Sequence, residues 1–101
     1  MCGIAGFISF NQTITHPAIH LEKALERLNK RGPDASGVFR DNNCELGHTR
    51  LSIIDTSFAA NQPMNDSSGR FVLVFNGEIY NYTKLKKELE KKNIKFKTSS
   101  D

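Results

Sequence analysis

The sequence of 101 residues contains no tryptophan, two cysteines and three prolines. No apolar run approaches the roughly 18 residues that a membrane-spanning helix needs, so no membrane association is expected. The N-terminus lacks a basic region followed by an apolar core, which argues against a secretory signal peptide. Without such a signal we expect a cytoplasmic protein, in which thiols remain reduced.

The two cysteines, Cys2 and Cys44, show no spacing that is typical of a metal site. Neither lies in a CxxC pattern or in a Cys/His cluster, so no metal is expected. A chain of 101 residues is long enough for one domain at most, and its hydrophobic core must be modest.

Positive charge is in excess, with a net charge of +3, but it is unevenly placed. Half of the 14 lysines and arginines lie in residues 84–97. There Leu85 and Leu89 are four residues apart while the lysines face outward, and Glu88 precedes Lys92 by four residues. This pattern indicates a solvated helix face rather than a nucleic-acid surface, so no nucleic-acid partner is expected.

Two amphipathic helices are predicted. The first begins at Pro17, which the first helical turn tolerates, and ends at the Gly32–Pro33 pair. The second is the lysine-rich segment, capped by Asn81 or Thr83 and ended by Asn93 in a left-handed conformation. The apolar stripe of the first helix consists of Leu21, Ala24, Leu25 and Leu28.

The remaining segments predict strands separated by turns and loops. Residues 71–75 (FVLVF) form an unbroken apolar run, which predicts a strand buried on both faces. The polar segment 57–70 is long enough to suggest a binding loop. This order of elements predicts an α+β fold whose sheet is larger than two helices can cover. The strands are expected at residues 3–10, 36–40, 44–55, 71–75 and 94–98.

Cys2 follows Met1 directly, and this position gives it two interpretations. A cysteine in an apolar strand is most often a buried, inert thiol. If Met1 is removed, Cys2 carries both a thiol and a free α-amine, whose pKa of about 7.7–8.0 suits a general base at neutral pH. Nucleophile and base then belong to one residue, which is the N-terminal variant of the usual pairing of a nucleophile with a neighbouring base.

The Asn76–Gly77 pair, which follows the apolar run, also has two interpretations. Acyl transfer through a thiol needs hydrogen-bond donors that face the oxyanion, and the Asn76 side chain and the Gly77 backbone N–H can supply them. An Asn-Gly pair is also the strongest short signal of a type I′ hairpin turn, which the local sequence favours. The local sequence leaves both interpretations open.

Charged residues near these segments could bind a zwitterion such as a free amino acid. Arg50, within an apolar segment, can bind an α-carboxylate through two hydrogen bonds, and Glu78 and Asp101 can accept hydrogen bonds from an α-ammonium. Each of the three is equally able to form a surface or structural ion pair. His48 is interpreted as a residue that satisfies a neighbouring group rather than as a catalyst.

Several motifs occur together in one order along the chain: MCGIAG, RGPDASG, LGHTRLSIID, QPM, FNGEIYNY and SSD. In this order they resemble the glutaminase domains of class II glutamine amidotransferases. The RGPD and RLSIID forms resemble most closely the branch of glutamine-hydrolysing asparagine synthetases.

The resemblance implies a role for each candidate residue. Cys2 corresponds to the nucleophile, exposed after the loss of Met1, and Asn76 and Gly77 correspond to the oxyanion hole. Glu78 and Asp101 correspond to the groups that hold the α-ammonium of glutamine. Arg50 corresponds to the arginine that holds the carboxylate of glutamine, and the wall beside it consists of Leu51, Ser52, Ile53 and Ile54. The turn at residues 31–34 is expected only to shape the site, and Cys44 matches no motif.

The resemblance also implies a fold and an activity. The expected fold is the four-layer αββα sandwich of N-terminal-nucleophile hydrolases, of which residues 1–101 are the N-terminal portion. Such domains continue beyond the SSD motif and precede a C-terminal synthetase domain of the same chain, where ATP and Mg²⁺ are expected; no cofactor is expected in residues 1–101. The implied reaction is hydrolysis of L-glutamine to glutamate and ammonia, with the ammonia used to amidate aspartate in asparagine biosynthesis.

Other interpretations remain open at the level of the sequence. The nitrogen acceptor can differ from aspartate, for example in the synthesis of a surface polysaccharide. The chain can also be an inactive fragment that serves as a binding module, or it can share its terminal chemistry with N-terminal-nucleophile proteases. A homodimer is compatible with the resemblance.

Overall fold

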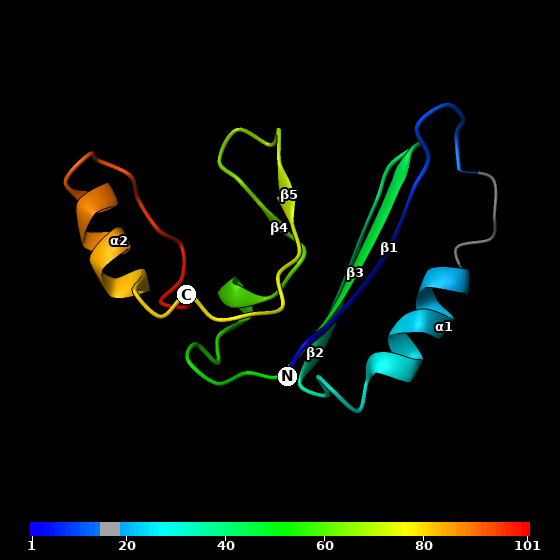
Figure 1. Ribbon diagram of the computed structural model, residues 1–101, viewed down its shortest axis with the longest axis horizontal. Helices are drawn as coiled ribbons and strands as arrows, with labels where there is room; N and C mark the ends of the chain where they lie inside the picture. Colours follow the sequence, from blue (N-terminus) through cyan, green and yellow to red (C-terminus); the bar gives the residue numbers. More distant parts are fainter. Residues whose placement is uncertain (15–18) are drawn as a thin grey trace.

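The computed structural model describes residues 1–14 and 19–101, so the helix start predicted at Pro17 lies outside the described residues. The chain forms a small α+β fold with antiparallel sheets, as the sequence predicted at that level (Figure 1). Its elements, in chain order, are β1 (Gly3–Ile8), α1 (Ile19–Leu28), β2 (Ala35–Arg40), β3 (Cys44–Arg50), the 3-10 helix η1 (Phe58–Ala60), β4 (Met64–Asn65), β5 (Val72–Leu73) and α2 (Tyr82–Glu90).

Strand β3 is the centre of a three-stranded sheet with the order β1-β3-β2. Both neighbours are antiparallel to it: Gly3 of β1 pairs with Thr49, and Ala35 of β2 pairs with Arg50. The start of β1 and the start of β2 therefore lie beside the end of β3. This register places Cys2 next to the residues that follow Arg50.

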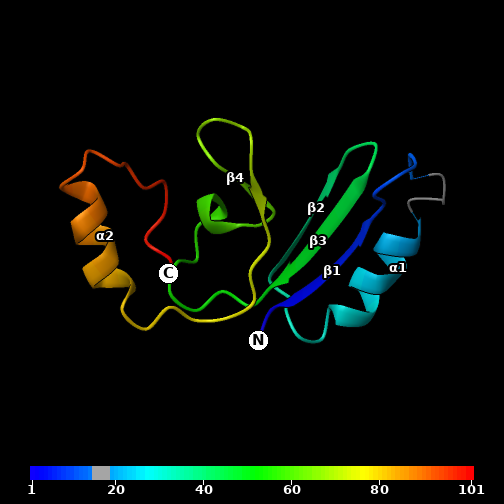
Figure 2. The same ribbon diagram turned by 45° about the horizontal axis from the view of Figure 1, so that its top comes forward.

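Helix α1 covers one face of this sheet and lies along β1 and β3 (Figure 2). Leu21 and Leu25 of the predicted apolar stripe are buried, and Leu21 has no exposed surface. Gly47 of β3 permits this close packing, because a Cβ atom there would lie 2.8 Å from a methyl carbon of Leu25. The core of the described residues sits here.

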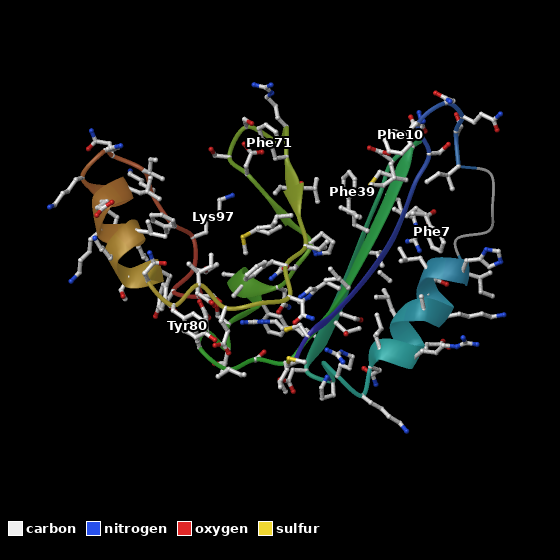
Figure 3. The ribbon with its side chains drawn as sticks, viewed as in Figure 1. Phe7, Phe10, Phe39, Phe71, Tyr80 and Lys97 are labelled. Atoms are coloured by element: carbon white, nitrogen blue, oxygen red, sulfur yellow. The ribbon has the colours of Figure 1, made fainter. Side chains whose placement is uncertain are left out.

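The apolar run 71–75 differs from the prediction. Only Val72 and Leu73 form a strand, β5, which pairs with the equally short β4. Phe71 and Leu73 are 65% and 55% exposed, so the prediction of a strand buried on both faces is wrong for this chain. An apolar run is buried on both faces only when a layer packs on each side. In the described residues Val72 and Val74 are half-buried, but the side of Phe71 and Leu73 is not covered. Figure 3 shows Phe71 near the outer end of the two-stranded ribbon.

Three other predicted strands also differ from the structure. The first strand ends at Ile8 instead of residue 10, and the strand predicted at residues 44–55 ends at Arg50. Beyond Arg50 neither neighbouring strand offers a partner, because the register has reached the start of both. Residues 94–98 form no strand. The predicted binding loop at residues 57–70 contains η1 and β4.

Helix α2 lies at the opposite end of the molecule from α1 (Figure 1). Asn81 occupies its N-cap position but makes no side-chain capping hydrogen bond, so that detail of the prediction is wrong, whereas Asn93 has the predicted left-handed conformation with φ of 64°. None of its residues is buried. The lysine-rich helix is thus solvated. Its apolar stripe is only partly covered, since Leu85 is 40% exposed and Leu89 is half-buried.

The molecule is elongated, with extents of 44 × 31 × 19 Å. Its radius of gyration of 15.0 Å exceeds the value of about 13 Å for a compact domain of this length. In the described part of the chain, no helix combines the length and the hydrophobicity that crossing a membrane requires.

Candidate functional site

A cavity of about 390 Å³ lies between the end of β3, the segment that follows it and residues 75–80. A volume of this size is within the range of roughly 300–1,000 Å³ that is usual for small-molecule sites. Every residue of the predicted site except Ser52 lines it: Cys2, Arg50, Leu51, Ile53, Ile54, Asn76, Gly77, Glu78 and Asp101. The tertiary structure therefore brings both ends of the chain to one cavity.

The Cys2 side chain is half-buried at the cavity and is a free thiol. The backbone N–H of Leu51 donates to Cys2 Sγ at 3.4 Å, and the thiol donates to the carbonyl oxygen of Leu51 at 3.8 Å. Arg31 Nε donates to the carbonyl oxygen of Cys2 at 3.3 Å. These contacts fix the sulfur against the wall formed by the residues after β3.

The turn at residues 31–34 shapes this wall, as the sequence predicted. Asp34 Oδ2 accepts a hydrogen bond from the backbone N–H of Ser52 at 2.7 Å, and the Asp34 N–H donates to the carbonyl oxygen of Arg50 at 2.9 Å. Gly32 lies so close to β3 that a Cβ atom would be 2.5 Å from the Thr49 carbonyl carbon. Ser52 does not line the cavity, and its backbone serves the turn.

Arg50 has a structural task that the sequence did not indicate. Its side chain is buried, and Nη1 donates to the carbonyl oxygen of Ser57 and to Asn61 Oδ1, both at 2.8 Å. Nη2 donates to the carbonyl oxygen of Asp55. Because a guanidinium has five N–H donors, these bonds leave Nε–H and one Nη2 proton unused by the hydrogen bonds of Arg50 in the described structure. Arg50 thus closes the segment 55–61 and still faces the site.

The Asn76–Gly77 pair does not form a type I′ turn. That turn needs a positive φ at both central residues, and neither residue has one. Both lie at the cavity. Phe75, the residue before them, has both of its backbone polar groups bound by side chains: its N–H donates to Gln62 Oε1 at 2.5 Å, and its carbonyl oxygen is 3.2 Å from His48 Nε2.

His48 is buried on β3, with 1% of its surface exposed. Burial lowers the pKa of His48 below its usual value; the nearby Arg50 charge acts in the same direction, and the hydrogen bond with Phe75 opposes both. A neutral imidazole has one donor and one acceptor nitrogen. Because a carbonyl oxygen only accepts, the contact with Phe75 assigns the proton to Nε2.

The two acidic residues of the predicted ammonium site lie at the cavity. Asp101 Oδ2 accepts a hydrogen bond from the backbone N–H of Ile79 at 2.7 Å. Since Ile79 follows Glu78 directly, this bond holds Glu78 near Asp101. Two carboxylates from segments that are distant in sequence therefore lie at one cavity.

Asp55 was not predicted to contribute to the structure around the cavity. Its Oδ1 accepts from the Ser57 N–H at 2.8 Å, and its Oδ2 accepts from the Ser99 N–H at 2.9 Å and from the Ser99 hydroxyl at 3.1 Å. The Ser57 side chain first, and then the backbone N–H groups of Ser99 and Ser57, hold the pKa of Asp55 well below its usual range. Asp55 therefore connects the segment after β3 to the SSD motif. Both motifs were recognised, but their contact could not be read from either.

Further residues line the cavity without having been predicted: Met1, His48, Ala60, Gln62, Phe75, Tyr80 and Ser100. Ala60 and Gln62 come from the segment that was predicted to be a binding loop. Within residues 1–14 and 19–101, no group of three or more His, Cys, Asp or Glu side chains is placed to hold a metal ion.

Comparison with known proteins agrees with this geometry. The sequence profile of the glutamine amidotransferase domain matches residues 1–101, so the chain belongs to the glutamine amidotransferase domain family. It is 39% identical over 105 residues to asparagine synthetase [glutamine-hydrolyzing] 1 of Bacillus subtilis and 37% identical over 101 residues to asparagine synthetase [glutamine-hydrolyzing] 1 of Arabidopsis thaliana. It is also 41% identical over 112 residues to the amidase chry2 of Gibberella zeae.

Each of these alignments covers 100% of this chain. The chain in turn spans only 16% or 17% of the length of these relatives. The resemblance drawn from the motifs is therefore confirmed at the level of the domain family, and it extends over the whole of the chain.

Proposed function

We propose that this protein hydrolyses L-glutamine to glutamate and ammonia, with Cys2 as the nucleophile after Met1 has been removed. The observation that supports this most directly is the set of groups around one cavity. Arg50 can bind the α-carboxylate, Glu78 and Asp101 can bind the α-ammonium, and Asn76–Gly77 can provide donors for the oxyanion. All five residues line the cavity. A free thiol and a zwitterion site together suit an amino acid with a side-chain amide.

The proposed reaction begins with transfer of the thiol proton of Cys2 to its own α-amine. The sulfur attacks the carboxamide carbon, a C–S bond forms, and the oxygen becomes an oxyanion that the donors of Asn76 and Gly77 stabilise. The C–N bond then breaks, and the α-ammonium returns the proton so that ammonia leaves. Water, activated by the α-amine, hydrolyses the thioester to glutamate and restores the thiol.

We infer that residues 1–101 are the N-terminal portion of a four-layer αββα sandwich. The exposed apolar residues of β5 and α2 support this, because further layers of the same domain would cover them. We also propose that a C-terminal synthetase domain of the same protein uses the ammonia. ATP and Mg²⁺ belong to that domain, and no step of the glutaminase reaction is assigned to them.

We propose aspartate as the acceptor of the nitrogen, in a cytoplasmic asparagine synthetase that can assemble as a homodimer. The names of the Bacillus subtilis and Arabidopsis thaliana relatives support this acceptor. The relative from Gibberella zeae is named an amidase, so an acceptor test must include carboxylates other than aspartate.

The test uses the full-length protein and its Cys2→Ala variant. Because the thioester cannot form without the sulfur, glutamine hydrolysis should fall by at least about 10⁴-fold in the variant, whereas synthesis driven by added ammonium should persist. A glutamine-like diazoketone should label Cys2 in the parent protein. The matched control is Cys44→Ala, which removes the other thiol and should leave both activities unchanged.

Three outcomes would contradict the proposal. Glutamine hydrolysis that is equal in Cys2→Ala and in the parent would exclude Cys2 as the nucleophile. Mass spectrometry that finds Met1 attached to the active protein would exclude the α-amine as the base. Cleavage of peptides without turnover of free glutamine would identify a protease instead.

A further inference from the structure

We propose that His48 and Gln62 are positioning residues of the glutaminase reaction, which hold Phe75 from both sides and thereby aim the donors of Asn76 and Gly77 at the oxyanion. This inference rests on the proposed function. It assigns a task to two residues that were not predicted as part of the site, although both line the cavity.

The geometry of Phe75 carries the argument. Its N–H donates to Gln62 Oε1 at 2.5 Å, and its carbonyl oxygen accepts from His48 Nε2 at 3.2 Å. A residue has one backbone donor and one backbone acceptor, so the two side chains use both. Strand β5 ends at Leu73, and Phe75 therefore lies outside any sheet ladder. Side chains replace the ladder at the residue directly before the oxyanion donors.

Both side chains come from well-anchored positions. His48 lies on β3, which is paired on both sides, opposite Ile4 of β1 and Gly37 of β2. Gln62 follows Asn61, whose side chain is held by Arg50 Nη1 at 2.8 Å. The same arginine that faces the proposed carboxylate site thus also fixes one half of the Phe75 contact. Substrate binding and oxyanion stabilisation share one scaffold.

The protonation of His48 fits this task. His48 faces Phe75 and lies near the Arg50 charge, and burial keeps its imidazole neutral. The proton on Nε2 goes to Phe75, and Nδ1 is buried without a hydrogen-bond partner in the described structure. An imidazole with one nitrogen unpartnered and the other bound to a backbone carbonyl is suited to positioning. It has no free donor for the substrate.

Loss of either hydrogen bond to Phe75 should lower kcat more than it changes KM. Cys2 and Arg50 are anchored by the sheet and by the turn at residues 31–34, so they stay in place when Phe75 is released. Ile79 has its own anchor in Asp101, which limits the movement of Glu78. Only the oxyanion donors are then misplaced. Because they interact with the substrate mainly in the transition state, loss of this interaction lowers kcat.

The experiment compares paired variants of the full-length protein. His48→Leu removes the donor, and His48→Gln keeps an N–H that can reach Phe75. Gln62→Met removes the acceptor, and Gln62→Glu keeps one. We expect His48→Leu and Gln62→Met each to lower kcat for glutamine hydrolysis roughly 100-fold, because a small displacement of catalytic donors has an effect of this size. KM should change less than about threefold, and the two conservative variants should restore most of kcat.

A second measurement distinguishes misplaced oxyanion donors from a general disruption of the site. An analogue of glutamine with an aldehyde in place of the carboxamide adds to the Cys2 thiol: a C–S bond forms as the C=O π bond opens, and the thiol proton balances the charge on the oxygen. Its affinity should fall together with kcat in His48→Leu and Gln62→Met. Alkylation of Cys2 by iodoacetamide, which needs no oxyanion hole, should keep its parental rate.

The outcomes distinguish this inference from the proposed function. If the parent protein shows no Cys2-dependent glutaminase activity, the proposed function itself fails. If that activity exists and either disruptive variant keeps the kcat of the parent, the positioning role is wrong. The role is equally wrong if KM and iodoacetamide reactivity change as much as kcat does. Should His48→Leu not fold, Gln62→Met, at a half-buried position, decides the question.

Discussion

The two halves of the chain are stabilised in different ways. In residues 1–50, β3 is hydrogen-bonded to β1 and β2 along its length, and α1 buries Leu21 and Leu25 against the sheet. In residues 51–101 the strands β4 and β5 have two residues each, and α2 buries none. This half is held mainly by side chains that bind single backbone groups, such as Asp55 with Ser99.

This difference teaches how folding and function are divided in the molecule. Apolar burial adds up with area and supports a rigid scaffold, whereas one hydrogen bond contributes only about 0.5–1.5 kcal/mol. The first half supplies Cys2 and Arg50 to the cavity, and the second supplies Asn76–Gly77, Glu78 and Asp101. We therefore expect core substitutions to affect stability first, and polar substitutions in the second half to affect the site first.

The largest effect is expected from Leu21→Ala. Leu21 is completely buried between α1 and β3, so its truncation leaves a cavity that costs about 2–5 kcal/mol of unfolding free energy. Urea unfolding of the full-length protein, followed through glutaminase activity, measures this loss. Ile19→Ala in the same helix is the control, because Ile19 is 47% exposed. Equal midpoints for the two variants would remove the distinction between a buried core and an exposed helix face.

An intermediate effect is expected from Asp55→Asn. Both carboxylate oxygens of Asp55 accept backbone N–H groups, so an amide places its own N–H against one of these donors. The link to Ser99 then loosens, and we expect KM for glutamine to rise about tenfold. Steady-state kinetics provides the measurement.

Asp66→Asn is the matched control for Asp55→Asn. Asp66 Oδ2 accepts the Ser68 N–H at 3.1 Å, two residues further on, as Asp55 accepts that of Ser57. The other backbone N–H that Asp66 accepts is that of Phe71, whereas Asp55 binds Ser99 of the SSD motif. Its hydrogen bonds, that of the Ser68 side chain first, lower its pKa to about 2. Asp66→Asn should leave KM unchanged. A similar rise in KM in both variants would mean that any such turn affects the site equally.

The smallest effect is expected from protonation of His48, which joins the two halves. The pKa of His48 in the folded protein lies below its usual value of 6.5, so the unfolded chain binds a proton that the folded protein resists. Stability is complete above pH 6.5 and falls as the pH is lowered through this value, by at most about 1.4 kcal/mol per pH unit.

This small effect is tested by measuring the unfolding free energy of the parent and of His48→Gln between about pH 5 and 8, the range in which histidine titrates. The decline below pH 6.5 should be shallower in the variant, because glutamine does not titrate. Parallel curves for the two proteins would show that protonation of His48 contributes nothing to the pH dependence. In that case the contact between His48 and Phe75, which joins the two halves, would not depend on the charge of His48.

Much of the first half could be predicted from the sequence. The stripe of Leu21 and Leu25 indicated α1, because helical periodicity is local, whereas the helix ends at Leu28, before the predicted stop at Gly32–Pro33. In the second half the same reasoning failed for FVLVF, whose predicted burial depends on layers that the described residues do not contain. The motifs around Cys2, Arg50 and Asn76 indicated the site, but Asp55, Gln62 and the positioning of His48 did not stand out, because their partners are distant in sequence.

The sequence by itself determined which kinds of group are present and where the first helix and the central strands form, because side-chain chemistry and local periodicity are properties of neighbouring residues. The folded arrangement alone shows that Asn76–Gly77 is not a type I′ turn, that Arg50 lines the cavity while it donates to its own loop, and that Asp55 reaches Ser99. Those outcomes depend on contacts between segments tens of residues apart. Their geometry exists only once the antiparallel register of β1, β2 and β3 has brought the segments together.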